Sequence, residues 1–89
     1  MYALICTDKP DSLEIRMANR AKHLDYVAET GVVLQAGPFL DEAGNMSGSL
    51  LILDLDNRQE AEAWAKGDPY AVAGLFLKVR IEKWKKVVG

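Results

Sequence analysis

The sequence predicts one α+β domain over residues 1–89, with a four-stranded antiparallel sheet and both helices on one face. The chain has 89 residues, which suffices for one domain and no more. Hydrophobic residues make up 49% and charged residues 27%, as in globular rather than disordered proteins. Strand-like and helix-like segments follow one another in the order βαββαβ.

The predicted elements are, in chain order, a strand over 2–7, a helix from about 12 to 30, strands over 32–39 and 47–55, a helix over 57–66, a short helical turn after 68 and a strand over 76–88. The first strand is apolar on both faces, which is typical of a buried strand. Asp11 or Ser12 is expected to cap the long helix, and Gly31 to end it.

Turn and capping residues delimit the second half of the chain. Residues 41–45 predict a hairpin loop between the second and third strands. Asn57 and Glu60 have the spacing of a capping box, and Gly67 is expected to end the helix that they open. Asp68 followed by Pro69 predicts a new helix start.

This order of elements is that of the ferredoxin-like split βαβ arrangement, with an antiparallel sheet and the helices on one face. The other face should be polar if it met water, yet the third strand places Leu50 and Ile52 opposite Leu51, Leu53 and Leu55. We therefore expect a homodimer in which two sheets pack through their open faces, as in dimeric α+β barrels.

The last strand is expected to carry two different faces. Leu77, Val79 and Ile81 form an apolar face. Phe76, Lys78, Arg80, Glu82 and Trp84 form the opposite face, whose charges would lie at the rim of the dimer or line a cavity.

On a helical wheel at ~100° per residue, with Arg16 at zero, an apolar arc spans ~20° to ~140°. Its members predict the core face of the long helix: Leu13, Met17, Ala21, Leu24, Val27 and Ala28. Arg20 falls inside this arc, and His23, the only histidine, falls at its edge beside Arg16. A cation and an imidazole are thus expected at the boundary between core and cleft. Periodicity alone favours a solvated head group for Arg20, whose stem covers the core, and a structural role for His23.

Asp68 has two possible roles. As the residue before Pro69, it is a typical helix cap. The antiparallel course of the two helices could also bring it near His23, where a carboxylate would orient the imidazole and favour its protonated form. Its oxygens would then be divided between backbone donors and the ring.

Several segments together resemble one known family: Arg20-Ala21-Lys22-His23-Leu24, Ala36-Gly37-Pro38, Gly48-Ser49-Leu50-Leu51-Ile52, Asp68-Pro69-Tyr70, Gly74-Leu75-Phe76 and Ile81-Glu82-Lys83-Trp84. In this order and spacing the chain resembles the YCII-related (YciI-like) family over essentially its whole length. Glu82-Lys83 stands where relatives often have Arg-Pro, at the end of the last strand.

The resemblance implies a dimeric ferredoxin-like α+β barrel with an active-site cleft around a His–Asp pair, here His23 and Asp68. Arg20 and Ser49 match polar positions of that cleft, and Gly37 and Pro38 match the turn that forms its wall. Some relatives are associated with dehydrochlorination of chlorinated aromatic metabolites. A cofactor-free lyase or isomerase acting on a small anionic or phenolic metabolite is one hypothesis. The others are a non-catalytic small-molecule binding or sensing dimer, and a purely structural dimer.

Several other classes are disfavoured. The net charge of −2 gives no electrostatic footprint for nucleic acid. One histidine and one cysteine, Cys6, without clustered ligands argue against a metal site, and no glycine-rich phosphate loop or other cofactor motif is present. No apolar run reaches the ~20 residues of a membrane span. Without a signal-peptide pattern at the N-terminus, a cytoplasmic location is expected.

Overall fold

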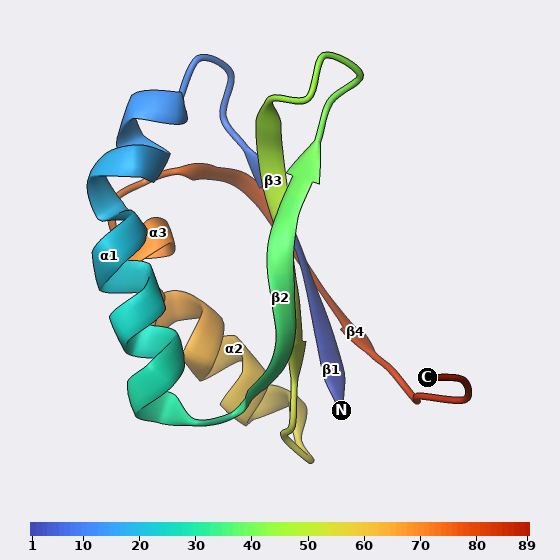
Figure 1. Cartoon of the computed structure of the whole chain (residues 1–89). Helices are drawn as coiled ribbons and strands as arrows, with labels where there is room; N and C mark the ends of the chain where they lie inside the picture. The colour runs from blue at the N-terminus through green and yellow to red at the C-terminus, as the bar shows by residue number, and fades with distance from the viewer.

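The computed structural model describes residues 1–89 as seven elements around one sheet (Figure 1). They are, in order, β1 (Tyr2–Asp8), α1 (Leu13–Thr30), β2 (Val33–Leu40), β3 (Met46–Leu53), α2 (Arg58–Gly67), α3 (Pro69–Val72) and β4 (Phe76–Lys83). The strand order is β2-β3-β1-β4, and every neighbouring pair is antiparallel. This is the predicted ferredoxin-like α+β fold.

The helices all lie on one face of the sheet, and its other face is bare (Figure 1). The core lies between the sheet and α2, where alternate residues of β1 and β3 meet Trp64. In the register, Tyr2 lies opposite Leu53 and Leu4 opposite Leu51. Tertiary packing of these apolar residues therefore builds the platform that supports the polar side chains described below.

The predicted caps are only partly correct. Gly31 adopts a left-handed conformation and ends α1, as predicted. Asn57 accepts a hydrogen bond from the backbone N–H of Glu60, which caps α2. At the start of α1, however, Ser12 makes no side-chain cap, because its hydroxyl donates to the Pro10 carbonyl instead.

The predicted core face of α1 is wrong for most of its members. Leu13, Met17 and Leu24 are each about half-exposed, and Ala21 and Ala28 are exposed as well. Val27 alone packs against the core cluster. The buried side chains of α1 are Arg16 and His23, which lie two helical turns apart. The helix is thus turned so that a polar stripe, rather than the apolar arc, faces the protein.

Two strands are shorter than predicted, since β3 ends at Leu53 rather than Leu55 and β4 ends at Lys83 rather than Val88. The sequence pattern puts Phe76 on the same face as Lys78 and Arg80, and this prediction is wrong. The register shifts between Thr7 and Asp8, so that Phe76 pairs with Asp8 and packs against the core. A bulge of this kind reverses the alternation that the sequence pattern assumes.

No helix of the protein is both long and apolar enough to span a membrane.

Candidate active site

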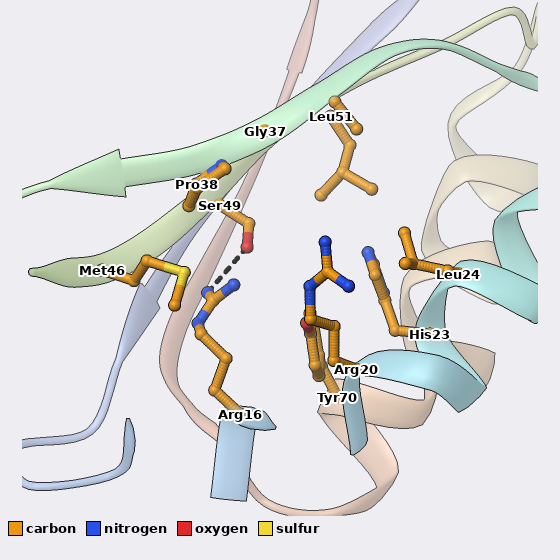
Figure 2. A pocket seen from close by; sticks show the side chains of 11 residues that line it. Arg16, Arg20, His23, Leu24, Gly37, Pro38, Met46, Ser49, Leu51 and Tyr70 are labelled. Atoms are coloured by element: carbon orange, nitrogen blue, oxygen red, sulfur yellow. Dashed lines mark hydrogen bonds between the residues drawn. The ribbon is translucent and has the colours of Figure 1, made fainter. Parts of the chain in front are cut away.

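A cavity of about 210 Å³ opens between α1 on one side and β2 and β3 on the other, with α3 beneath it. Its polar lining residues are Arg16, Arg20, His23, Ser49 and Tyr70. Its remaining walls are formed by Leu24, Ala36, Gly37, Pro38, Met46 and Leu51 (Figure 2). Of the apolar arc of α1, only Leu24 borders this cleft, and the edge strand β2 forms the facing wall.

His23 and Asp68 form a buried pair behind this cavity. The His23 Nδ1 atom lies 2.7 Å from Asp68 Oδ1, and the two residues are only 7% and 1% exposed. When Asp68 is ionised it can only accept, so Nδ1 carries the hydrogen and Nε2 is left without one in the neutral ring. The imidazole lines the cavity, and Figure 2 shows a ring nitrogen directed into it.

Asp68 also caps α3. The same Oδ1 atom that meets His23 accepts a hydrogen bond of 3.0 Å from the backbone N–H of Tyr70. Both predicted contacts of Asp68 are present, but they share one oxygen rather than being divided between the two. The cap fixes the carboxylate relative to α3, and the carboxylate in turn fixes the orientation of the imidazole.

Arg16 lies at the other end of the cavity, where its guanidinium is buried and hydrogen-bonded to several protein groups. Its guanidinium makes two hydrogen bonds to Asp8, with Nε 2.9 Å from Oδ2 and Nη2 3.0 Å from Oδ1. Nη2 also lies within hydrogen-bond distance of the Gly48 carbonyl and of Ser49 Oγ, at 2.9 and 2.8 Å. Burial lowers the pKa of Arg16, but the hydrogen bond and charge of Asp8 outweigh it and raise the pKa, so that the cation is permanent.

Tyr70 lies between Arg16 and His23 (Figure 2). Its ring stacks on the imidazole with centroids 4.0 Å apart and planes 12° apart, and the Arg16 guanidinium carbon is 4.9 Å from its centroid. Residues seven apart on a helix are separated by ~10.5 Å, which leaves room for one ring. A tyrosine face attracts cations, so this stack suits the Arg16 guanidinium.

The structure brings the predicted site residues together. Arg20, His23, Gly37, Pro38 and Ser49 line one cavity, and Asp68 holds His23 from behind. Arg20 makes no ion pair in the protein, in contrast to Arg16. The cavity therefore has one unpaired cation on its wall and no carboxylate among its lining residues.

Sequence reasoning did not place Arg16 and Tyr70 in the site. For Arg16, the available signal was its spacing of seven residues from His23, which puts both on one face of a helix. For Tyr70, the signal was its position two residues after the Asp68 cap, whose carboxylate holds its backbone N–H. Neither signal indicates a ligand without the tertiary structure.

Fold and site together define the class of protein: a ferredoxin-like α+β domain whose open cleft carries a carboxylate-oriented imidazole and two guanidinium groups. The residues gather no group of three or more His, Cys, Asp or Glu side chains that could hold a metal ion. What this arrangement offers chemically is proton transfer and binding of anions.

Comparison with known proteins identifies the family. A family model for the YCII-related domain matches residues 1–85, and the chain belongs to this family. It is 35% identical over 96 aligned positions to Protein YciI of Escherichia coli O6:H1, and the alignment covers 98% of each chain. An uncharacterized protein of Haemophilus influenzae is 36% identical, with 97% of each chain covered.

A solved structure is also closely similar. It is 5-chloro-2-hydroxyhydroquinone dehydrochlorinase (TftG) from Burkholderia phenoliruptrix AC1100, in complex with 2,5-dihydroxybenzoquinone. The TM-score is 0.85 and the sequence identity 31%, and the similarity covers 94% of this chain and 92% of the other.

Proposed function

We propose that this protein is a cofactor-free lyase or isomerase that uses His23 and Asp68 for acid–base chemistry on a small anionic or phenolic metabolite. The observation that carries the proposal is the 2.7 Å contact between His23 Nδ1 and Asp68 Oδ1, on an imidazole that lines a cavity. This contact leaves Nε2 as the proton acceptor, and the carboxylate stabilises the imidazolium that forms.

The size and charge of the cavity favour a single-ring anion. Its volume is about 210 Å³, whereas an engineered protein cavity of about 150 Å³ accommodates benzene. The extra space suits a few ring substituents. Arg20, the unpaired guanidinium on the wall, is assigned to a substrate carboxylate or phenolate, and Ser49 to a hydrogen bond with substrate. Gly37 and Pro38 are assigned to the wall against which the ring lies.

The similarity to the dehydrochlorinase supports elimination as the reaction class. Elimination of HX takes a proton from the substrate and breaks its carbon–halogen bond, so the halide leaves with the bonding electrons and no oxidant is needed. His23 Nε2 accepts the proton in this scheme. Asp68 positions the imidazole, and the guanidinium groups stabilise the negative charge of the substrate oxygen.

We also propose that the protein is a homodimer formed through the open face of the sheet. On that face the half-buried Ile5 lies opposite Leu50, which is 36% exposed, in the strand register. An apolar centre of this kind is typical of a surface that packs against another sheet.

The test is turnover of a panel of chlorinated and non-chlorinated single-ring phenols and hydroxyquinones. His23→Ala should lower kcat by about 10²- to 10⁴-fold, the usual contribution of a general acid–base group. Lys22→Gln is the matched control, since Lys22 neighbours His23 on α1 but is exposed and outside the cavity. It should leave turnover unchanged.

The outcomes separate the three hypotheses. Undiminished turnover by His23→Ala contradicts the catalytic role of His23. Binding of ring anions by the wild type without turnover, and only modestly weakened by His23→Gln, indicates a binding or sensing module. A His23→Ala variant that only loses thermal stability, in a protein that binds none of these compounds, indicates a structural tie between α1 and α3.

A further inference from the structure

The polar side chains of the cavity share one property: they have hydrogens to donate and almost nothing with which to accept. Arg16 and Arg20 carry guanidinium groups, which are donors only. Ser49 has its Oγ atom engaged as the acceptor of the Arg16 Nη2 hydrogen, so its own hydrogen is directed elsewhere. In a neutral ring, His23 Nε2 is the nitrogen acceptor of this set.

The Tyr70 hydroxyl is in the same situation. Tyr70 is only 3% exposed, and the side-chain hydrogen bond that acts on its phenol is one with Arg16. Because a guanidinium can only donate, the Tyr70 oxygen accepts in this contact and its own hydrogen is directed elsewhere. Tyr26 differs, because its hydroxyl donates to the Trp64 carbonyl. Figure 2 shows the oxygen end of Tyr70 turned toward the cavity that the residue lines.

The charges around Tyr70 keep its hydrogen available. Burial raises the pKa of the phenol, and the positive charges of Arg16 and Arg20 oppose this shift. The charge of Asp68 adds to the rise, so the phenol is a protonated donor near neutral pH. The two guanidinium groups cannot accept its hydrogen, and the Asp68 Oδ1 atom is engaged with His23 and the Tyr70 backbone N–H. An acceptor oxygen of a ligand in the cavity can therefore take up the Tyr70 hydrogen without competing with a protein acceptor.

We propose that Tyr70 is a ligand-binding residue that donates its phenolic hydrogen to an anionic ring oxygen, next to the hydrogen that Ser49 donates. The cavity then selects compounds with at least two acceptor oxygens on one ring, in the class of ionised polyhydroxylated aromatics and hydroxyquinones. This inference deepens the proposed function, since it concerns the same cavity. It concerns binding, however, and does not require that the ligand be turned over.

The stacking of Tyr70 on His23 also relates ligand binding to proton transfer. The Tyr70 and His23 rings are nearly parallel and in contact, and Figure 2 shows the Tyr70 oxygen and a ring nitrogen of His23 both directed into the cavity that the two residues line. A ring whose oxygen accepts from Tyr70 thereby presents a neighbouring group to His23 Nε2. Binding and proton transfer are then aligned by one contact.

The test is calorimetric binding of 2,5-dihydroxybenzoquinone, whose acidic hydroxyls are ionised at neutral pH, to the wild type, Tyr70→Phe and Tyr26→Phe. Tyr70→Phe keeps the ring and its stack but removes the hydroxyl. It should bind roughly tenfold or more weakly, as expected for loss of a hydrogen bond to a charged acceptor. Tyr26→Phe removes a hydroxyl outside the cavity and should bind like the wild type.

Equal affinities of Tyr70→Phe and the wild type would overturn the proposal, and so would a wild type that fails to bind the compound at millimolar concentration. If Tyr70→Phe weakens binding while no panel compound is turned over by the wild type, the Tyr70 proposal stands and the proposed function fails.

A second measurement needs no change at Tyr70. The chain has three tyrosines, so Tyr2→Phe and Tyr26→Phe assign the ¹³Cζ resonances of all three. Addition of 2,5-dihydroxybenzoquinone to the wild type should shift the Tyr70 resonance and leave those of Tyr2 and Tyr26 in place. A Tyr70 resonance that does not move would contradict the proposal.

Discussion

At the scale of single residues, Asp68 combines two tasks on one atom. Its Oδ1 accepts from the Tyr70 backbone and contacts His23, so the start of α3 and the position of the imidazole depend on the same carboxylate. Substitutions that keep the cap but change the charge can separate the two tasks.

Asp68→Asn should destabilise the protein less than Asp68→Ala, because an asparagine side chain caps a helix about as well as aspartate does. We expect the difference in the free energy of unfolding to be about 1 kcal/mol, in favour of asparagine. Urea denaturation measures it. Equal costs for the two variants would mean that the cap contributes nothing.

Cys6 makes stability depend on alkaline pH. Burial raises the pKa of the Cys6 thiol from its ordinary 9.0 to about 12. Between these values the unfolded chain loses the thiol proton while the folded chain keeps it, so the free energy of unfolding falls as pH rises. Burial also raises the pKa values of Tyr26 and Tyr70, which act in the same direction.

Cys6→Ala should therefore reduce the steepness of this loss by up to about 1.4 kcal/mol per pH unit, which corresponds to one proton. Urea denaturation at several pH values between 9 and 12 measures the two slopes. Parallel slopes for the wild type and the variant would contradict a buried, protonated thiol.

At the scale of elements, the sequence predicted the order and kind of every strand and helix but not which face of α1 is buried. Hydropathy predicts that the arc of Leu13, Met17 and Leu24 is buried. It carries no information on the ion pairs that Arg16 forms with Asp8 and His23 with Asp68, which allow these two polar side chains to be buried instead. These partners are distant in sequence, and only the fold brings them within reach. The six predicted site residues nevertheless come together, although their roles remain predictions.

The strand ends show a similar limit. The apolar Val87 and Val88 extended the predicted last strand, yet both are almost fully exposed and lie beyond the end of β4. β4 is hydrogen-bonded along only one edge, to β1, so an apolar sequence alone cannot prolong it where β1 has ended.

The ion pair that anchors the start of α1 should be strongly coupled. Arg16→Met leaves the Asp8 carboxylate buried without its partner and should lower the free energy of unfolding by about 3–5 kcal/mol. Adding Asp8→Leu should recover a large part of this loss, since both buried charges are then gone. Denaturation of the two single variants and the double variant measures the coupling.

The pair between Arg58 and Glu62 is the matched control. Both side chains are about half-exposed, and the residues lie four apart on α2. Arg58→Met should cost no more than about 0.5 kcal/mol. A similar cost at Arg16 and Arg58 would contradict the structural importance of the buried pair.

At the scale of the whole molecule, the single chain exposes more surface than its size requires. Its accessible surface is 5862 Å², whereas scaling for a chain of this mass gives about 5,200 Å². The excess is consistent with the bare face of the sheet and the exposed flank of α1, and it favours association with a second copy.

Leu50→Glu should convert the proposed dimer into a monomer, because it places a charge at the centre of the open sheet face. Val72→Glu is the control, since Val72 is exposed on α3, on the other side of the sheet. Sedimentation equilibrium measures both. A monomeric wild type, or a dimeric Leu50→Glu variant, would contradict dimerisation through this face.

The central claim is that Asp68 fixes His23 with its hydrogen on Nδ1 and leaves Nε2 as the proton acceptor in the cavity. Long-range ¹H–¹⁵N correlation spectroscopy of the single imidazole, at a pH where the ring is neutral, reads the tautomer directly. We predict the Nδ1–H tautomer in the wild type. A neutral ring protonated on Nε2 would contradict the claim, because the atom facing the cavity could then only donate.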